Sequence, residues 1–386
     1  MRLFEQLGEA LPQLGLNITF YINNAYYVWF TEVPNFVGVP IPTTLVSIVF
    51  SCGSILMGLF NGISAALHLF QTRTVLLGTG SLNRDRLKIL VEAGIDLNEA
   101  DEDGKTPLMA AVTKNNKDLI IALIHEGVNL DVQDRNKNTA LIWAALNNHT
   151  EMGLALISGG ANLDLKDKKK RTALICAAQN NNTELGLALM AGGANLDLQD
   201  NSKTTALIWT VRQKNNDFGL ALIRSGANLD LQDDDKNTAL TLAAALNNTV
   251  LGKALICGGA NLNHQDSNKL TALIWAAWKS NTELGLALIS GGANLDAQSN
   301  GKNTALIWAA RENNTELGLA LIASGANLDL QSSRKITALI MAATRNNKEL
   351  GLALIHAGAN RDIQDKDGKK ALDYTKNQEM RCALNQ

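Results

Sequence analysis

Hydrophobic and polar positions repeat along this chain with a period of 33 residues. Each period holds two short apolar runs separated by polar residues. No insertion or deletion interrupts the series, and a threonine opens the first run of each complete unit. A fixed period of this length is typical of a stack of small units, each burying its apolar face against its neighbours. The opening positions are Thr106, Thr139, Thr172, Thr205, Thr238, Thr271, Thr304 and Thr337, followed in phase by Lys370.

The unit that begins at Thr304 predicts two helices. In its first apolar run, Leu306, Ala309 and Ala310 share one face at helical spacing, and the small alanines allow close packing. The asparagine pair at 313–314 should end this helix, because asparagine tolerates the left-handed backbone conformation. Thr315 can then cap a second helix over 317–323. That run is apolar almost all round, so we expect it to be buried.

Two recurring motifs give these repeats a resemblance to the ankyrin family. The segment TPLMAA at 106–111 is similar to the family's Thr-Pro-Leu-His-x-Ala-Ala. The segments GANLD at 160–164 and 325–329 are similar to its Gly-Ala-Asp-hydrophobic-Asn. The resemblance implies an all-α fold, an ankyrin-type solenoid of helix-turn-helix repeats with β-turn tips. We count about ten repeats over residues 73–386, of which the first and the last are degenerate caps.

The repeats depart from the family at the turn glycine. That glycine is kept at Gly104 and Gly368, in the outermost turns, and is lysine in seven turns between them. If the position still needs a positive φ, each lysine costs about 1–2 kcal/mol relative to glycine. A different turn geometry is the simpler alternative. The lysines are Lys137, Lys170, Lys203, Lys236, Lys269, Lys302 and Lys335.

A second departure is a glycine inside the second helix, where the family usually has an aliphatic residue. A glycine inside a helix costs roughly 1 kcal/mol against alanine, so it calls for a packing reason. We infer that these glycines make room for the tryptophans that recur in the first helix. The glycines are Gly153, Gly186, Gly219, Gly252, Gly285, Gly318 and Gly351, and the tryptophans are Trp143, Trp209, Trp275 and Trp308.

Residues 1–72 differ in kind from the repeats. No charged residue lies between Glu32 and Arg73, and residues 44–70 are long and apolar enough for a transmembrane helix. Small residues form a stripe on this segment that would let membrane helices approach closely. Basic residues follow the segment, so the repeats should face the cytoplasm. The alternative is a soluble cytoplasmic protein whose N-terminal region packs as a cap on the solenoid. The stripe consists of Ser54, Gly58, Gly62 and Ala66.

Composition and residue spacing argue against most kinds of chemistry. The net charge is −2, whereas a nucleic-acid binder normally carries a basic face. The five histidines are spread along the chain and form no ligand cluster, and the four cysteines have no metal-ligand spacing. We therefore expect no enzymatic activity, no metal, no cofactor and no small-molecule substrate.

Two columns of recurring residues have structural interpretations. The aspartates near the repeat turns form a ladder of turn-stabilising carboxylates: Asp164, Asp197, Asp230 and Asp296. The tryptophan column packs between neighbouring first helices, or it is partly exposed along the concave groove, where it would contact a partner.

Residues that vary while the repeat frame stays fixed are the candidates for partner binding. In families of this kind, the turn tips and the ends of the first helices face the partner. Exposed tryptophan and arginine most often dominate binding energy. The lysine column would form a cationic row along the tips, interrupted by Asp234 and Asp235. The candidate residues are Arg135, Lys168, Lys169, Arg171, Arg212, Trp278, Lys279, Arg311 and Arg345.

The combined pattern predicts a non-enzymatic scaffold that is anchored in a membrane and binds a protein partner through its tips and concave groove. Such an array with an added apolar segment is similar to host-directed effectors of intracellular bacteria. The alternative is a soluble scaffold or inhibitor.

Overall fold

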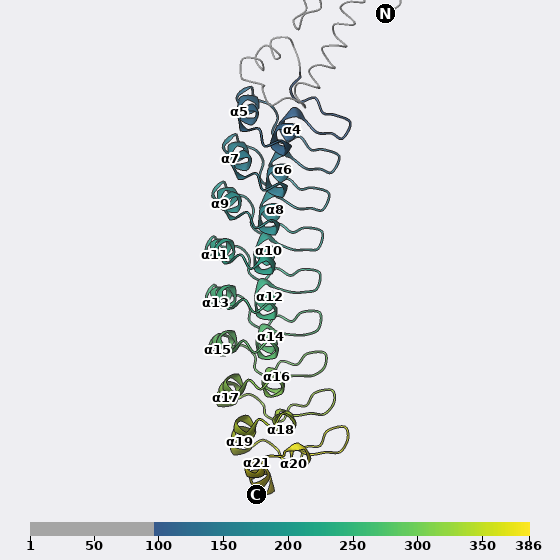
Figure 1. Ribbon diagram of the computed structural model, residues 1–386, viewed down its shortest axis with the longest axis vertical. Helices are drawn as coiled ribbons and strands as arrows, with labels where there is room; N and C mark the ends of the chain where they lie inside the picture. Colours follow the sequence, from purple (N-terminus) through teal and green to yellow (C-terminus); the bar gives the residue numbers. More distant parts are fainter. Residues whose placement is uncertain (1–95) are drawn as a thin grey trace, which may run out of the picture. The chain divides into compact units, whose positions relative to one another are not determined.

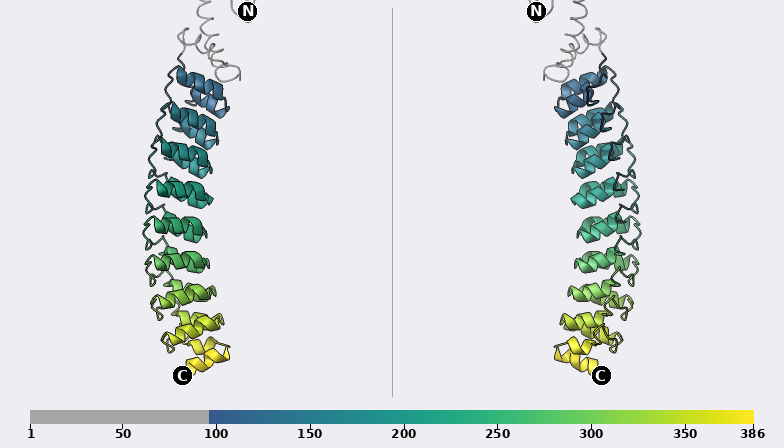
Figure 2. Two further views of the ribbon diagram at one scale, coloured as in Figure 1. Left: turned by 90° about the vertical axis from the view of Figure 1, so that its left-hand side faces the viewer. Right: turned by 90° about the vertical axis from the view of Figure 1, so that its right-hand side faces the viewer.

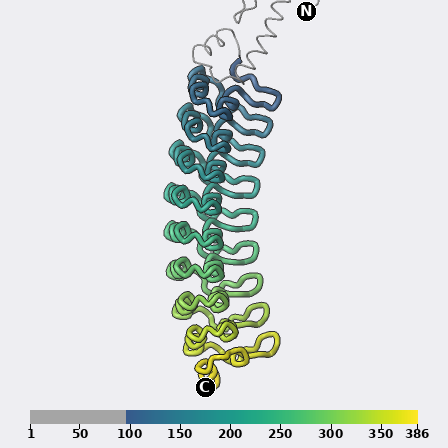
Figure 3. Tube along the Cα trace, viewed as in Figure 1, coloured from purple at the N-terminus to yellow at the C-terminus, as the bar shows by residue number. Residues whose placement is uncertain are grey.

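The structure, a computed structural model, describes residues 96–386 as a stack of helix pairs (Figure 1). In this part of the chain the regular structure is helical, with turns between the helices and no strand. The first helices of successive units form a middle column, with the second helices on one side and the turn tips on the other (Figures 1 and 3). Turned views show each pair lying above the next without a break (Figure 2). The predicted solenoid of helix pairs is therefore confirmed for these residues.

The helices alternate between the two columns. The first helices are α4 (Pro107–Thr113), α6 (Ala140–Leu146), α8 (Ala173–Gln179), α10 (Ala206–Gln213), α12 (Ala239–Ala245), α14 (Ala272–Trp278), α16 (Ala305–Arg311), α18 (Ala338–Thr344) and α20 (Ala371–Tyr374). The second helices are α5 (Lys117–His125), α7 (Thr150–Ser158), α9 (Thr183–Ala191), α11 (Asn216–Arg224), α13 (Thr249–Cys257), α15 (Thr282–Ser290), α17 (Thr315–Ala323), α19 (Lys348–His356) and α21 (Gln378–Asn385).

The recurring threonine caps each first helix from α4 to α18, and Lys370 stands at the equivalent position of α20. In α16, the Thr304 hydroxyl accepts a hydrogen bond from the backbone amide of Ile307 at 3.2 Å. Asn313, with a φ of 59°, then ends the helix in the left-handed conformation, as its sequence predicts. The predicted cap of the second helix is wrong by one residue. Asn314 is the N-cap. Its own backbone is not helical, and its side-chain oxygen accepts a hydrogen bond from the backbone amide of Leu317 at 3.2 Å.

Burial differs between the two columns of helices. The first helix is buried nearly all round: Leu306, Ile307, Ala309 and Ala310 in α16 are each at most 2% exposed. The expected burial of the second helix holds for one face only. In α17 only Leu317, Gly318 and Leu321 are buried, because each second helix packs on its own first helix and on its two neighbours and leaves the far face to solvent.

The glycines of the second helices make room for the next second helix, not for the tryptophans. A Cβ added to Gly285 would lie 2.6 Å from a methyl carbon of Leu317. At Gly186 it would meet the ring of Phe218, and at Gly351 it would meet Met380. The expected link to the tryptophan column is therefore wrong: the large side chain that fills the space comes from the following second helix.

Asparagine and aspartate side chains join the loops that follow the second helices. The backbone amide of Asn195 donates to Asp164 Oδ1 at 2.9 Å, and the same bond recurs one unit further from Asn228 to Asp197 at 2.8 Å. Asp230 and Asp296 accept equivalent bonds from the next unit. The expected ladder of turn-stabilising carboxylates is present, and it fixes the register between units.

None of the helices in the described part of the chain is long and apolar enough to span a bilayer. The predicted transmembrane segment 44–70 and its stripe Ser54, Gly58, Gly62 and Ala66 lie outside the described residues.

Candidate functional site

Most turn tips are held by an aspartate at their start, and Ser299 and Ser332 take its place in two of them. In the turn at 134–138, Asp134 Oδ1 accepts the backbone amides of Asn136 and Asn138, both at 2.8 Å. The amide of Lys137 donates to the carbonyl of Asp134 at 2.8 Å and closes the turn. The tip also bonds to its neighbour, since the amide of Lys168 in the next turn donates to the carbonyl of Asn136 at 2.9 Å. The tips therefore form one connected edge with a fixed spacing.

The seven turn lysines keep the backbone conformation of the glycines they replace. Their φ angles lie between 54° and 60°, while Gly104 and Gly368 in the outer turns have φ of 77° and 74°. The alternative of a different turn geometry is wrong, because the hydrogen bonds that close the turn need a left-handed residue at this position. Each lysine thus costs about 1 kcal/mol or more relative to glycine.

The turn aspartate also binds the first helix of its own unit. Trp143 Nε1 donates to Asp134 Oδ2 at 3.0 Å, and Trp275 Nε1 donates to Asp266 Oδ2 at 3.0 Å. Trp209 makes the same bond to its turn aspartate at 3.2 Å. These three tryptophans are half-buried, and each contributes a polar contact as well as packing. The tryptophan column therefore connects the turn tips to the first helices.

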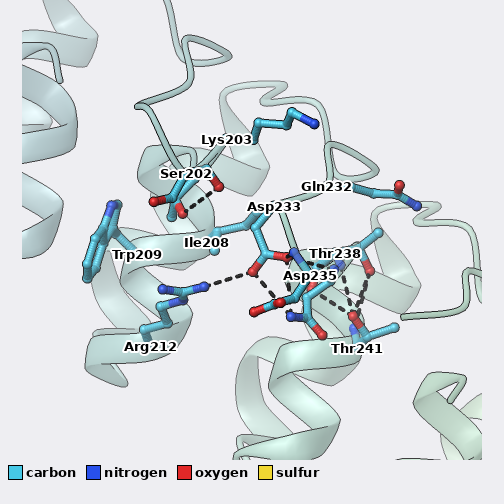
Figure 4. Close-up of polar contacts among 12 residues, drawn as sticks. Ser202, Lys203, Ile208, Trp209, Arg212, Gln232, Asp233, Asp235, Thr238 and Thr241 are labelled. Atoms are coloured by element: carbon cyan, nitrogen blue, oxygen red, sulfur yellow. Dashed lines mark hydrogen bonds and ion pairs between the residues drawn. The ribbon is translucent and has the colours of Figure 1, made fainter. Parts of the chain in front are cut away.

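An arginine binds the turn aspartate in two units whose first helix has no tryptophan to donate an indole N–H to it. Asp233 belongs to the unit whose column residue is Leu242, and Arg212 of the preceding unit binds its Oδ2 at 2.7 Å (Figure 4). The guanidinium also lies 5.4 Å from the centre of the Trp209 ring. Arg212 was predicted to bind a partner. In the structure it is one-third exposed and forms a charge-assisted contact between two units.

Arg171 is held in the same way within one unit. Its guanidinium lies 2.7 Å from Asp167 Oδ2 and donates to Gln179 Oε1 at 3.0 Å. Its side chain is only 15% exposed. Of the predicted cationic patch at this turn, Lys168 and Lys169 are exposed, and Arg171 instead joins the turn to the end of α8. Turn tips and first-helix ends thus form one continuous surface.

Three tryptophans stack where two successive units meet. The Trp278 ring lies between Trp275, at a centroid distance of 4.8 Å, and Trp308, at 4.6 Å. Lys279 Nζ lies 5.4 Å from the centre of the Trp278 ring, and the Arg311 guanidinium lies 4.7 Å from the Trp308 ring. Trp278 is 36% exposed, and it is one of few large apolar side chains exposed in the described part of the chain. These five residues, here called the tryptophan cluster, bring together three of the predicted binding residues.

The tryptophan cluster contains an unsatisfied donor. Trp308 is 92% buried (8% exposed), and its Nε1 has no hydrogen-bond partner. The turn position that supplies a carboxylate to the other three tryptophans of the column is Ser299 in this unit. The Ser299 hydroxyl accepts only the amide of Asn303, at 3.2 Å. Ser332 stands at this position in the next unit, whose column residue is Met341 and needs no acceptor.

The remaining predicted residues are all exposed. Arg135, Lys168 and Lys169 lie at turn tips, and Arg345 caps the end of α18. None of the four makes an ion pair within residues 96–386. The structure therefore brings Trp278, Lys279 and Arg311 together in one cluster and spreads the other cations along the edge.

The described residues offer little for catalysis. No group of three or more His, Cys, Asp or Glu side chains within 96–386 could hold a metal ion. Burial raises the pKa of the Cys176 thiol to about 12, so this thiol is protonated at neutral pH and is a poor nucleophile.

The Tyr374 hydroxyl donates to Asp365 Oδ2 at 2.5 Å, and this bond lowers the pKa of the carboxyl group. This pair repeats the tryptophan–aspartate contact in the last unit.

The pairing of turn and column residues had no signal of its own in the sequence. Aspartate occurs nine residues before Trp143, Trp209, Trp275 and Tyr374, but it also occurs nine residues before Ala110, Cys176 and Leu242, whose side chains have no N–H donor. The serine before Trp308 is therefore recognised as an exception only from the structure. The stack of Trp278 between two units had no sequence signal beyond its place at a helix end.

Comparison with known proteins agrees with this geometry. A family model described as ankyrin repeats, in three copies, matches residues 78–167, 154–233, 211–299, 240–332 and 306–380. A search of the curated proteins found no match.

Proposed function

Because this chain belongs to the ankyrin repeat family, we propose that it is a non-enzymatic scaffold that holds a protein partner on the surface formed by its turn tips and first-helix ends. Proteins of this family generally bind other proteins. Binding would be noncovalent and would need no cofactor. The second helices form the opposite column and would support this surface from behind.

The tryptophan cluster is the observation that carries this proposal. A stacked tryptophan that stays 36% exposed, with Lys279 over its own ring and Arg311 over the ring of Trp308, offers a flat apolar area and two cations in one place. Tryptophan and arginine are the residues most enriched among those that dominate binding energy. Because the rings are held by stacking, little side-chain entropy is lost when a partner covers them.

The arginines at 171 and 212 have a supporting role in this proposal. Each is bound to a buried turn aspartate, so each would position the surface and contribute less to direct contact. Direct contacts would come from Trp278, Lys279 and Arg311, with further cations at the tips and at Arg345.

We further propose that residues 44–70 anchor the chain in a membrane. The absence of charge in this segment and its stripe of small residues support the anchor. A role as a host-directed bacterial effector rests on the same combination of segment and array. Extraction of membranes with carbonate tests the anchor: the full chain should stay in the membrane pellet. Recovery in the supernatant would favour the soluble scaffold.

A crosslinking experiment tests the binding surface. A photoreactive phenylalanine analogue at Arg345 should capture a discrete protein from a lysate of the source cells. The same analogue at Val250, which is 52% exposed on the second helix α13, is the matched control. Alanine at Trp278, Lys279 and Arg311 together should abolish capture and leave the circular dichroism spectrum unchanged. Equal capture at both positions, or unchanged capture by the triple variant, would show that the binding surface lies elsewhere.

A further inference from the structure

The seven turn lysines are in a backbone conformation that favours glycine. All seven have φ between 54° and 60°, and the same turn is made by glycine at both ends of the array. The lysine takes part in the turn through its backbone: the amide of Lys137 donates to the carbonyl of Asp134, and its own carbonyl accepts from Gln133 Nε2 at 2.8 Å. The turn therefore needs a left-handed residue and has no use for the lysine side chain.

The lysine side chains also have few partners within the solenoid. All seven lysines are exposed. Within residues 96–386 only Lys203 of the seven lies in an ion pair, 3.6 Å from Asp234, and both side chains are more than half exposed. The two residues that precede the lysine differ in every one of the seven turns, while the lysine stays the same. A residue that is kept at a conformational cost, and without a structural contact, indicates a role outside the fold.

The hydrogen bonds between tips place these lysines in a regular row. The amide of Lys168 bonds to Asn136, and that of Asn201 bonds to Lys169, so neighbouring turns cannot slide past one another. Successive units are packed helices and lie about 10 Å apart. An extended polypeptide rises about 3.3 Å per residue, so roughly three of its residues match one repeat.

We propose that the lysine row binds an extended acidic segment of a protein partner, with a carboxylate at about every third residue. This inference rests on the proposed scaffold function and adds the chemistry of the partner. Arg135, Lys168, Lys169 and Arg334 lie at the same tips and add positive charge at both ends of the row. Asp234 and Asp235 in the middle would face an uncharged or basic residue of the segment. A polypeptide can vary its residues to fit this interruption, whereas a nucleic-acid backbone or an anionic membrane presents charge throughout.

The test uses the full chain and a fluorescent peptide that repeats Glu-Pro-Thr, with binding measured by fluorescence anisotropy. The control peptide has the same composition with its glutamates in one block. The variant Lys269→Gly/Lys302→Gly/Lys335→Gly removes three ammonium groups at positions where glycine suits the backbone. Binding of the spaced peptide should weaken about tenfold, as expected for three exposed ion pairs. The urea midpoint of the variant should be equal to or higher than that of the wild type, which excludes unfolding as the cause.

Three results would overturn the proposal. These are unchanged affinity in the triple-glycine variant, equal affinity for the spaced and blocked peptides, and tighter binding of oligothymidylate or of phosphatidylserine vesicles than of the spaced peptide. A triple arginine variant should keep the affinity, because the charge and its spacing are retained. The alanine variant at Trp278, Lys279 and Arg311 separates the two proposals. If it loses partner capture while the triple-glycine variant keeps it, the scaffold function stands and the acidic segment is refuted.

Discussion

The buried indole N–H of Trp308 predicts that Ser299→Asp stabilises the solenoid. In the equivalent turn of the preceding unit, Asp266 Oδ2 accepts Trp275 Nε1 at 3.0 Å, and its Oδ1 accepts two backbone amides at 2.8 and 2.9 Å. Aspartate at 299 would supply the same acceptor to Trp308, whose Nε1 has none.

The size of the effect follows from the unsatisfied donor. Leaving a buried donor without a partner costs about 1–3 kcal/mol, and a hydrogen bond to a charged acceptor contributes about 1.5–3 kcal/mol. Part of this gain is offset by the desolvation of the new carboxylate. We expect the free energy of unfolding, measured by urea denaturation with circular dichroism, to rise by about 1–2 kcal/mol.

The next turn offers a matched control. Ser332 has the same place and accepts the amides of Arg334 and Ile336 at 3.3 and 3.2 Å, but its unit carries Met341, which has no N–H to satisfy. Ser332→Asp should gain only what the carboxylate adds to the turn. The difference between the two variants is therefore the contribution of the indole hydrogen bond.

A double-mutant cycle tests whether the indole N–H of Trp308 is the source of the gain. In a Trp308→Phe background the gain from Ser299→Asp should shrink to that of the Ser332 control, because no indole N–H remains. The indole proton of Trp308 should also move in a nitrogen–proton NMR spectrum of Ser299→Asp. If the gain is the same with and without the indole, or if no gain occurs, the unsatisfied donor is not a source of instability.

Three further predictions concern packing, backbone strain and pH. Gly186→Ala should lower the free energy of unfolding, measured by urea denaturation, by about 1–3 kcal/mol. The loss should exceed that of Gly285→Ala, because the new methyl group at 186 meets the rigid ring of Phe218, and equal losses would contradict this. Lys302→Gly should raise the free energy of unfolding by about 1 kcal/mol. A loss would mean that the left-handed lysine carries no strain. Burial raises the pKa of Cys176 from 9.0 to about 12, so only the unfolded chain ionises at pH values between the two. Stability should therefore fall by about 1.4 kcal/mol at pH 10 relative to a Cys176→Ala variant, and parallel pH profiles would refute this.

Much of the candidate site could be predicted from the sequence, because its residues occupy positions that vary against a fixed frame. Trp278 and Arg311 stand at the ends of first helices, and this place in the repeat was enough to select them. The roles of Arg171 and Arg212 could not be predicted in this way. Each binds a turn aspartate, and Arg212 reaches Asp233 in the following unit, a contact that depends on the distance between units.

The sequence predicts the repeating architecture and the ends of the first helices. These features follow from local chemistry: an apolar period, a threonine that caps a helix and an asparagine that ends it. The packing of the folded units sets which large side chain fills the space beside Gly285, which carboxylate each tryptophan or arginine binds, and how three tryptophans stack. Gly285 and Leu317 lie in successive units, as do Trp278 and Trp308, so their contacts depend on the rise and rotation between units, which no single repeat encodes. The tryptophan–aspartate bond lies within one unit and depends on how the turn folds back on the first helix.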